Sequence, residues 1–339
     1  MNAGQSQSQS QGEGQGQSQS QTQGEPDASP PLRWLRVEHE TVYDYDVPVE
    51  LAHHLACLSP RVTPWQQVRN WRLTIDPLPD CTVELDDKDL DGDGTRNPLS
   101  LDPWGNMRLV FSHEHVHERL SVTSVFEAGL AAAPELHLRL SPPWEEVAES
   151  LRYHAGAVRS EAVEFTLASH FAPRDAALAA FGREAFTPGR PLAEGAYALM
   201  SLINEQFAYK PLSTQVDTRA PEVLTLRSGV CQDFAHVMIG ACRSLGLAAR
   251  YVSGYLLTHP AAGQPRLVGA DASHAWVAVW CPELGWLALD PTNDVVAGHD
   301  HVTLAWGRDY ADVAPLRGVI RGGGKAQPRV AVTVAPIEE

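Results

Sequence analysis

Residues 274–290, HAWVAVWCPELGWLALD, constrain the fold of this chain most strongly, because two alternating apolar segments flank a short turn. Successive side chains of a strand point to opposite faces of a sheet, so the even-numbered residues of each segment share one face. A turn centred near Pro282 or Glu283 pairs even-numbered positions with even-numbered positions in either register. The segment therefore predicts an antiparallel hairpin that carries His274 and Asp290 on one face, within direct or diagonal reach.

A cysteine lies at the start of the helix that is predicted before this hairpin. In VCQDFAHVMIGACRSLG the apolar residues recur at the spacing of one helix face, and Gly246 ends the segment. Cys231 falls in the first turn, where unpaired N–H groups and the positive end of the helix dipole favour a thiolate. Gly229 would leave the Cys231 N–H free to hold an oxyanion. Position thus makes Cys231 a candidate nucleophile, although buried structural cysteines are commoner.

The chain order of these side chains suits a catalytic triad. A cysteine nucleophile needs a base, and the base needs a third group that orients it. Taken singly, His274 is typical of a core histidine, and Asp290 of a turn initiator before a proline. Taken together, Cys231, His274 and Asp290 supply the nucleophile, the base and the orienting carboxylate. We therefore predict that these three residues are catalytic.

Composition divides the chain into three parts. Residues 1–31 are nearly pure Gln, Ser and Gly and are predicted to be a disordered tail. Residues 32–130 alternate short Val-, Leu- and Tyr-rich runs with turn-forming segments, which is typical of an antiparallel β-sandwich. Residues 131–339 begin with helical segments such as PLAEGAYALMSLINEQF, continue with the cysteine helix and several strands, and end on VAVTV. This last part predicts an α+β core with a C-terminal strand segment.

Charge and hydropathy limit the partners. The chain has 26 Lys plus Arg against 42 Asp plus Glu, and its formal net charge of -16 repels phosphate backbones. We expect no nucleic-acid partner. No segment approaches the roughly 20 apolar residues of a spanning helix, and residues 1–31 lack the apolar run of a secretion signal, so no membrane partner is expected either. Five cysteines without a CxxC pair fit a reducing compartment, and we expect a cytoplasmic location.

Several of these segments resemble a known family. SGVCQDFAHV, LGLAARYVSGY, SHAWVAVW and GWLALDPTND are similar to the core of the transglutaminase-like superfamily, which has a papain-like fold. The stretch from Val37 to Phe126, with VYDYDVPVELAHHLACLSPR and DPWGN, resembles the β-sandwich that precedes this core in bacterial members, and GRDYADVAPLRGV resembles their C-terminal segment. The resemblance covers about residues 32–335 and implies the same catalytic roles for Cys231, His274 and Asp290.

The same resemblance implies acyl transfer on amide bonds of a peptide or protein substrate, with no cofactor. Hydrolysis by a protease or amidase is favoured over isopeptide formation by a transglutaminase, and a non-catalytic peptide-binding module is the rival of another class. In the family an upstream side chain can complete the oxyanion hole, and Tyr209 or Gln206 in NEQFAYKP could do so here. The substrate and the oligomeric state stay open.

Two segments invite a metal interpretation. DDKDLDGDGT (86–95) matches the first positions of an EF-hand loop, but its twelfth position is Pro98 rather than Glu, so an acidic hairpin loop is expected. In HEHVHE, His113, His115 and His117 alternate along a predicted strand and could ligate zinc, although no fourth ligand is identified. We expect an exposed strand face there and predict no metal.

Three further polar or thiol residues of the cysteine helix are assigned to structure. His236 lies about 140° around the helix from Cys231 and should point away from the thiol. Cys242 lies about 16 Å along the axis, too distant for a disulfide, and should belong to the core. Asp233, in the first turn, should interact with the helix dipole rather than act as an acid.

Overall fold

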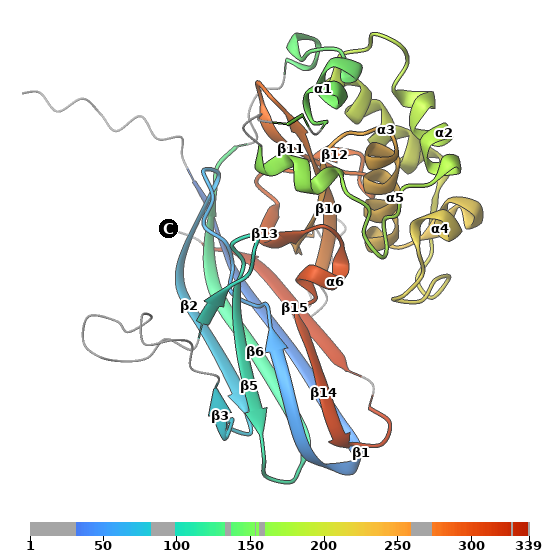
Figure 1. The fold of residues 1–339 in the computed structure, drawn as a ribbon. Helices are drawn as coiled ribbons and strands as arrows, with labels where there is room; N and C mark the ends of the chain where they lie inside the picture. The colour runs from blue at the N-terminus through green and yellow to red at the C-terminus, as the bar shows by residue number, and fades with distance from the viewer. Residues whose placement is uncertain are drawn as a thin grey trace, which may run out of the picture. The chain divides into compact units, whose positions relative to one another are not determined.

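A computed structural model of the chain describes residues 32–82, 99–132, 137–152, 154–155, 160–258, 273–326 and 328–337 (Figure 1). The predicted tail and the predicted acidic loop at 86–95 lie outside these residues. Within them the chain forms an antiparallel β region followed by an α+β core, so the fold class predicted from the sequence is confirmed.

An antiparallel sheet of eight strands forms the β region (Figure 1). Its strands are β1 (Arg33–Ala56), β2 (Gln66–Asp76), β3 (Cys81–Thr82), β4 (Leu99–Leu101), β5 (Met107–His113), β6 (His117–Leu130), β14 (Leu316–Gly322) and β15 (Arg329–Pro336). The first half of the long strand β1 pairs with β6 and β15, and its second half pairs with β5 and β14. Because β1 has partners along both of its halves, hydrogen bonds link all eight strands of this region.

The last two strands of the chain belong to this N-terminal sheet. The sequence groups them with residues 131–339, but β14 pairs with the second half of β1 and β15 with the first half. The register places Val334 opposite Val37 and Val332 opposite His39. Val332 and Val334 are buried in the same apolar cluster as Val37, so the alternation of VAVTV serves the core of the N-terminal sheet.

The α+β core contains six α-helices and a five-stranded antiparallel sheet within the described residues. The helices are α1 (Trp144–Ser150), α2 (Ala176–Ala185), α3 (Leu192–Gln206), α4 (Ala220–Leu226), α5 (Cys231–Ser244) and α6 (Tyr310–Val313), with 3-10 turns at Leu138–Leu140 and Glu161–Thr166. The sheet order is β12 (Val295–Val296), β11 (Gly285–Asp290), β10 (Ser273–Cys281), β9 (Ala249–Leu256) and β13 (His301–Gly307). A short parallel pair joins β7 (Ala208–Tyr209) to β8 (Ser228–Gly229).

Helix α5 packs on β9 and β10 through its apolar face, as the sequence predicts for the cysteine helix. The odd-numbered residues of β10, such as Val277 and Val279, are buried in the same cluster as Met238 and Ala241 of α5. The even-numbered face of the sheet points the other way and carries a separate small cluster around Trp276. No helix of the described residues is both long and apolar enough to cross a bilayer.

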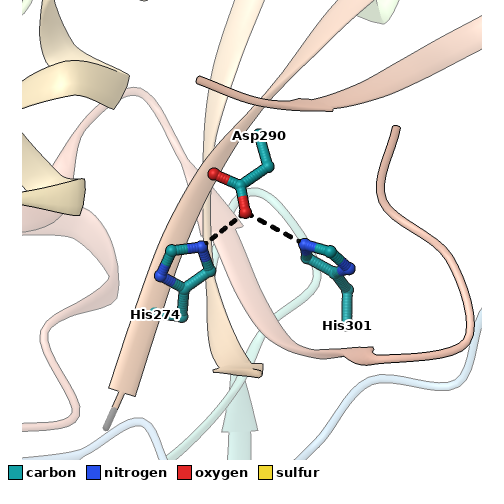
Figure 2. A group of neighbouring side chains, drawn as sticks. All are labelled: His274, Asp290 and His301. Atoms are coloured by element: carbon teal, nitrogen blue, oxygen red, sulfur yellow. Dashed lines mark hydrogen bonds and ion pairs between the residues drawn. The ribbon is translucent and has the colours of Figure 1, made fainter. Parts of the chain in front are cut away.

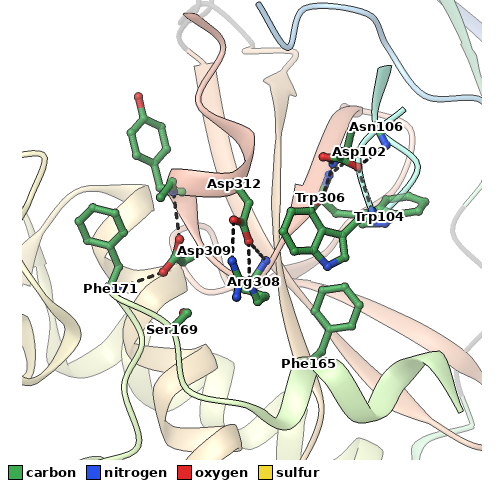
Figure 3. Close-up of polar contacts among 12 residues, drawn as sticks. Asp102, Trp104, Asn106, Phe165, Ser169, Phe171, Trp306, Arg308, Asp309 and Asp312 are labelled. Carbon is green, nitrogen blue, oxygen red and sulfur yellow. Dashed lines mark hydrogen bonds and ion pairs between the residues drawn. The ribbon is translucent and has the colours of Figure 1, made fainter. Parts of the chain in front are cut away.

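The DPWGN turn connects the N-terminal sheet to the core (Figure 3). The Asp102 carboxylate accepts the N–H groups of Trp104 and Asn106, at 2.9 and 2.8 Å, which closes the turn. The Asn106 amide then donates to the Trp306 carbonyl at 2.7 Å and accepts the Trp306 N–H at 3.1 Å. One side chain therefore satisfies both backbone groups of a β13 residue.

The segment that follows β13 is held by carboxylates (Figure 3). Asp309 caps α6 by accepting the Ala311 N–H at 3.0 Å, and its second oxygen accepts the Phe171 N–H at 3.0 Å. Arg308 pairs with Asp312 at 3.0 Å. These contacts position Tyr310 beside the pocket described below.

Candidate active site

His274 and Asp290 lie on one face of the β10–β11 hairpin and bond directly. The register pairs Ala278 with Ala288 and Trp280 with Trp286, so even-numbered residues face each other, as the alternation predicts. His274 Nε2 lies 2.7 Å from Asp290 Oδ2 (Figure 2). This is the geometry in which a carboxylate orients an imidazole and stabilises its protonated form.

Asp290 is fully buried, and both of its oxygens are hydrogen-bonded. Oδ1 accepts the backbone N–H groups of Thr292 and Asn293, at 2.9 and 3.3 Å. Oδ2 accepts the Asn293 side-chain amide at 2.7 Å and faces the Nε2 atoms of both His274 and His301. Burial raises the pKa of Asp290, but the hydrogen bonds to His274 and His301 outweigh it and hold this pKa well below its usual range. The group is a carboxylate.

His301 and Asn293 were not predicted from the sequence. Asn293 follows Asp290 in PTND, where an Asp before a proline signals a turn whose next residues fold back on the carboxylate. His301 begins β13, which pairs with β9 on the far side of β10. Only this strand order brings His301 to Asp290, and no local pattern in HDHVTLAW signals it.

Cys231 occupies the first position of α5, as predicted, and its side chain is half-buried. It lines a pocket of about 360 Å³ together with His274. Burial lowers the pKa of His274, but the hydrogen bond with Asp290 and the adjacent Cys231 side chain outweigh it and raise the pKa to about 10. Because Nε2 faces Asp290, Nδ1 is the ring nitrogen that remains to exchange a proton with the thiol.

The Asp233 carboxylate accepts the hydrogen bonds that fix the start of α5. Its Oδ2 accepts the Val230 N–H at 2.8 Å, which caps the helix, and the Thr214 hydroxyl at 2.7 Å. A Cβ at Gly229 would lie 2.5 Å from this oxygen, so glycine is required there. The predicted structural role of Asp233 thus fits its contacts. The Cys231 N–H, in the first turn, has no acceptor within the helix and remains available to an oxyanion.

Of the two candidates for the oxyanion hole, Tyr209 lines the pocket and Gln206 turns elsewhere. Gln206 Oε1 accepts a hydrogen bond from Arg227 at 2.8 Å. Burial, and then the charge of Cys231, raise the pKa of the Tyr209 phenol, so its hydroxyl stays protonated and can donate. Of the two residues, Tyr209 is thus the one that lies at the pocket of Cys231.

The N-terminal sheet contributes one wall of the same pocket, which the sequence did not predict. His39, Thr41 and Tyr43 of β1 line it, as does Val330 of β15. His39 is buried and bonds the Tyr255 hydroxyl at 2.8 Å, so this wall is joined to β9 of the core. Residues of both the N-terminal sheet and the core therefore line the pocket of Cys231.

The other residues weighed in α5 have structural environments. His236 is fully buried, stacks on Phe171 and accepts the Tyr310 N–H at 3.2 Å. Burial, and then the charge of Arg243, lower the pKa of His236 to about 3, so it is neutral. Cys242 is buried and makes no disulfide.

The histidines of HEHVHE do not share one strand face, so that part of the prediction is wrong. His113 ends β5 and His117 begins β6, with a turn between them. The cause is Asp80, whose carboxylate accepts the N–H groups of Glu114 and His115 and bends the chain. His113 Nε2 bonds the Pro77 carbonyl at 2.8 Å, whereas His115 pairs with Asp80.

Among the described residues, one set of side chains brings metal-ligand atoms together, and it is His274, Asp290 and His301, within 4.8 Å of one another. Two imidazoles and a carboxylate could hold a transition metal. In this structure the Nε2 atoms of both histidines bond Asp290 Oδ2, so these atoms are engaged with each other. His274 also lines the pocket of Cys231.

In the core, a helix that begins with a cysteine packs on an antiparallel sheet that carries a histidine–aspartate pair, which is the arrangement of a papain-like fold. A protein from Cytophaga hutchinsonii, described as a candidate cysteine protease, has a solved structure that matches with a TM-score of 0.66 at 19% identity. The match covers 91% of this chain and 92% of that one, and it confirms the fold.

The family follows from the sequence comparisons. The model of the transglutaminase-like superfamily matches residues 179–291, and that of the bacterial transglutaminase-like N-terminal region matches residues 35–128. An uncharacterised protein of Mycobacterium tuberculosis is 38% identical over 311 residues, which span 89% of this chain and 93% of the relative. The chain belongs to the transglutaminase-like superfamily.

A second relative is named for an activity. The protein-glutamine gamma-glutamyltransferase of Pseudomonas aeruginosa is 40% identical over 133 residues, which span 38% of this chain and 20% of that protein. The similarity is thus confined to a part of each chain.

Proposed function

We propose that this protein is a cysteine-dependent enzyme that hydrolyses amide bonds of peptides or proteins, as a protease or amidase. The observation that carries the proposal is the 2.7 Å bond from Asp290 to His274, which lines a pocket together with Cys231. Membership of a superfamily that acts on amides supports an enzyme over a binding module. The predicted cytoplasmic location would keep the thiol reduced.

In the first half-reaction the Cys231 thiolate attacks the carbonyl carbon of the amide. The negative charge moves to the carbonyl oxygen, which accepts hydrogen bonds from the Cys231 N–H and the Tyr209 hydroxyl. The tetrahedral intermediate then collapses, the carbon–nitrogen bond breaks, and the His274 imidazolium gives its proton to the leaving nitrogen. Asp290 stabilises the imidazolium before this transfer. The products are a thioester on Cys231 and a free amine.

In the second half-reaction His274, now neutral, takes a proton from water as the water oxygen attacks the thioester. The thiolate leaves, and the product is a carboxylic acid. Transfer to a primary amine in place of water would give an isopeptide bond. The relative from Pseudomonas aeruginosa, named as a protein-glutamine gamma-glutamyltransferase, is the observation that favours this second candidate function.

The test is a screen of glutamine-containing peptides with mass-spectrometric readout, with and without an added primary amine. Hydrolysis gives cleaved or deamidated peptide in both arms, whereas transglutamination gives the amine adduct when the amine is present. Cys231→Ala should abolish every product. Cys81→Ser, which changes an exposed thiol outside the pocket, is the matched control and should keep full activity.

The reactivity of Cys231 distinguishes the enzyme from a non-catalytic binding module. The enzyme requires a reactive thiol, and the binding module does not. Iodoacetamide labelling of Cys231 near neutral pH should proceed faster than labelling of glutathione, because a thiolate paired with an imidazolium is the reactive form. Labelling no faster than glutathione, together with no product from the peptides, would favour the binding module.

A further inference from the structure

A second pocket, of about 440 Å³, lies against the face of the five-stranded sheet that points away from α5. Four tryptophans, Trp65, Trp276, Trp286 and Trp306, line it together with Arg250. The rest of the lining combines alanine, valine and leucine with polar residues, among them Gln66, Glu161 and His301. No residue lines both this pocket and the pocket of Cys231, although His301, which bonds Asp290, lies in its wall.

Arg250 is an unusual buried cation. Its exposed fraction is 9%, and its guanidinium carbon lies 4.1 Å from the ring centre of Trp286 and 3.8 Å from that of Trp306. It forms no hydrogen bond or ion pair with any residue that the structure describes, and its Nε is buried without a partner. Aromatic rings stabilise a guanidinium through their faces but accept none of its in-plane N–H groups in the usual geometry.

A second buried arginine, Arg243, differs from Arg250 because protein atoms accept its hydrogen bonds. Arg243, on α5, donates to the carbonyls of Phe165, Ala249 and Arg308 and to the Ser169 hydroxyl, at 2.7 to 3.2 Å. Its donors are thus satisfied by protein atoms. The donors of Arg250 are left for something else to satisfy, because burying an unpaired polar group is costly.

Two further observations locate the unpaired charge inside the pocket. Trp286 Nε1 is also buried without a partner, so two residues of the same pocket, Arg250 and Trp286, each carry an unpaired donor. Arg61 stacks on Trp306 at 3.5 Å and adds positive charge nearby. Glu161 lines the pocket but forms no ion pair with Arg250. Burial lowers the pKa of Arg250 to about 9, which still leaves it charged at neutral pH.

We propose that this pocket binds a small organic ligand that carries a carboxylate on an apolar body. The carboxylate accepts hydrogen bonds from the in-plane N–H groups of Arg250 and from Trp286 Nε1, which supplies the missing acceptors. The apolar body lies against Trp276, Ala278 and Ala288. The proposal does not depend on the reaction at Cys231, because its readout is binding.

The test is calorimetric titration of the full chain with three probes. 3-Phenylpropionate carries both the charge and the apolar body, 3-phenylpropanol carries the body alone, and acetate carries the charge alone. We expect 3-phenylpropionate to bind about tenfold or more tightly than either of the others. Equal affinity for the acid and the alcohol, or no detectable binding of the acid, would overturn the proposal.

Variants assign the binding to this pocket. Arg250→Met should remove the preference for the acid. Arg69→Met is the matched control, because Arg69 also stacks on a tryptophan, Trp34 at 3.8 Å, but lies outside the pocket. Unchanged binding in Arg250→Met, or equal loss in both variants, contradicts the proposal.

If Arg250→Met fails to fold, a second variant keeps the test decisive. Ala288→Leu retains Arg250 and fills part of the pocket. It should weaken binding of 3-phenylpropionate about tenfold or more, since the apolar body loses its space. An unchanged affinity in this variant would place the ligand elsewhere and overturn the proposal.

Discussion

His301 Nε2 lies 3.1 Å from Asp290 Oδ2, the same carboxylate oxygen that bonds His274 Nε2 at 2.7 Å (Figure 2). The carboxylate is therefore shared between two imidazoles, one from β10 beside Cys231 and one from β13. His301 does not line the pocket of Cys231, so we describe it as a positioning residue that acts through Asp290.

Replacing His301 tests this role. His301→Leu removes one of the hydrogen bonds that fix the Asp290 carboxylate, so the carboxylate orients His274 less well, and kcat should fall about ten- to a hundredfold with little change in KM. Because the two imidazoles share Asp290 Oδ2, loss of His301 leaves more of the negative charge to His274, and the basic limb of the pH–kcat profile should move to higher pH. A merely structural role would lower the amount of folded enzyme without moving that limb. His301→Gln, whose amide can still donate to Asp290, should restore most of the rate.

Replacing Asp290 by Asn tests the pair itself. The amide keeps the shape but removes the charge that favours the His274 imidazolium, and we expect kcat to fall roughly 10²- to 10⁴-fold. Asp294→Asn is the control, because Asp294 lies on the same loop but bonds Ser201 rather than His274. The kcat of both variants is measured by steady-state kinetics on a substrate found in the peptide screen. Activity of Asp290→Asn within a few-fold of the parent would contradict the assignment.

The raised pKa of His274 predicts a pH dependence of stability. The folded value is about 10 and the ordinary value is 6.5, so folding takes up a proton between these limits. The stabilisation is complete below pH 6.5 and is lost as the pH rises through about 10. The free energy of unfolding should therefore fall with rising pH across this window. In His274→Gln, urea unfolding should show a flatter dependence, and an identical slope in both proteins would refute the linkage.

Tyr209→Phe tests the oxyanion hole. Loss of the hydroxyl removes one donor to the developing oxyanion and should lower kcat about 10²- to 10³-fold while leaving the fold intact. Tyr197→Phe changes a tyrosine of α3 that does not line the pocket, and it should be neutral. If the two variants lose activity equally, Tyr209 does not contact the oxyanion.

The contact between Gly229 and Asp233 predicts a non-additive pair of substitutions. Gly229→Ala places a methyl group 2.5 Å from Asp233 Oδ2 and should cost about 1 to 3 kcal/mol of stability. Asp233→Ala removes the helix cap and should cost about 0.5 to 2 kcal/mol. In the double variant the contact with the carboxylate oxygen is gone, and only the contact with the Cβ of residue 233, at 2.7 Å, is left, so the cost should be smaller than the sum. Chemical denaturation gives the free energy of unfolding of the parent, the two single variants and the double variant. Strictly additive losses of stability would exclude the contact.

Local patterns determine much of this site. The alternation in β10 and β11 places His274 and Asp290 on one face in any even-to-even register, and this follows from the two-residue period of a strand. The position of Cys231 in the first turn of α5 follows from helical spacing and Gly246. In HEHVHE the same alternation fails, because a carboxylate distant in sequence, Asp80, turns the chain between β5 and β6.

What the sequence by itself determined is thus the hairpin, the helix and the residues that each of them carries. Only the tertiary structure decided that His301 reaches Asp290, that β1 residues such as Tyr43 form a wall of the pocket, and that β15 closes the N-terminal sheet. These contacts join segments far apart in the chain. Strand order and strand pairing set them, and neither leaves a periodic trace in the sequence, because many orders bury the same apolar faces equally well.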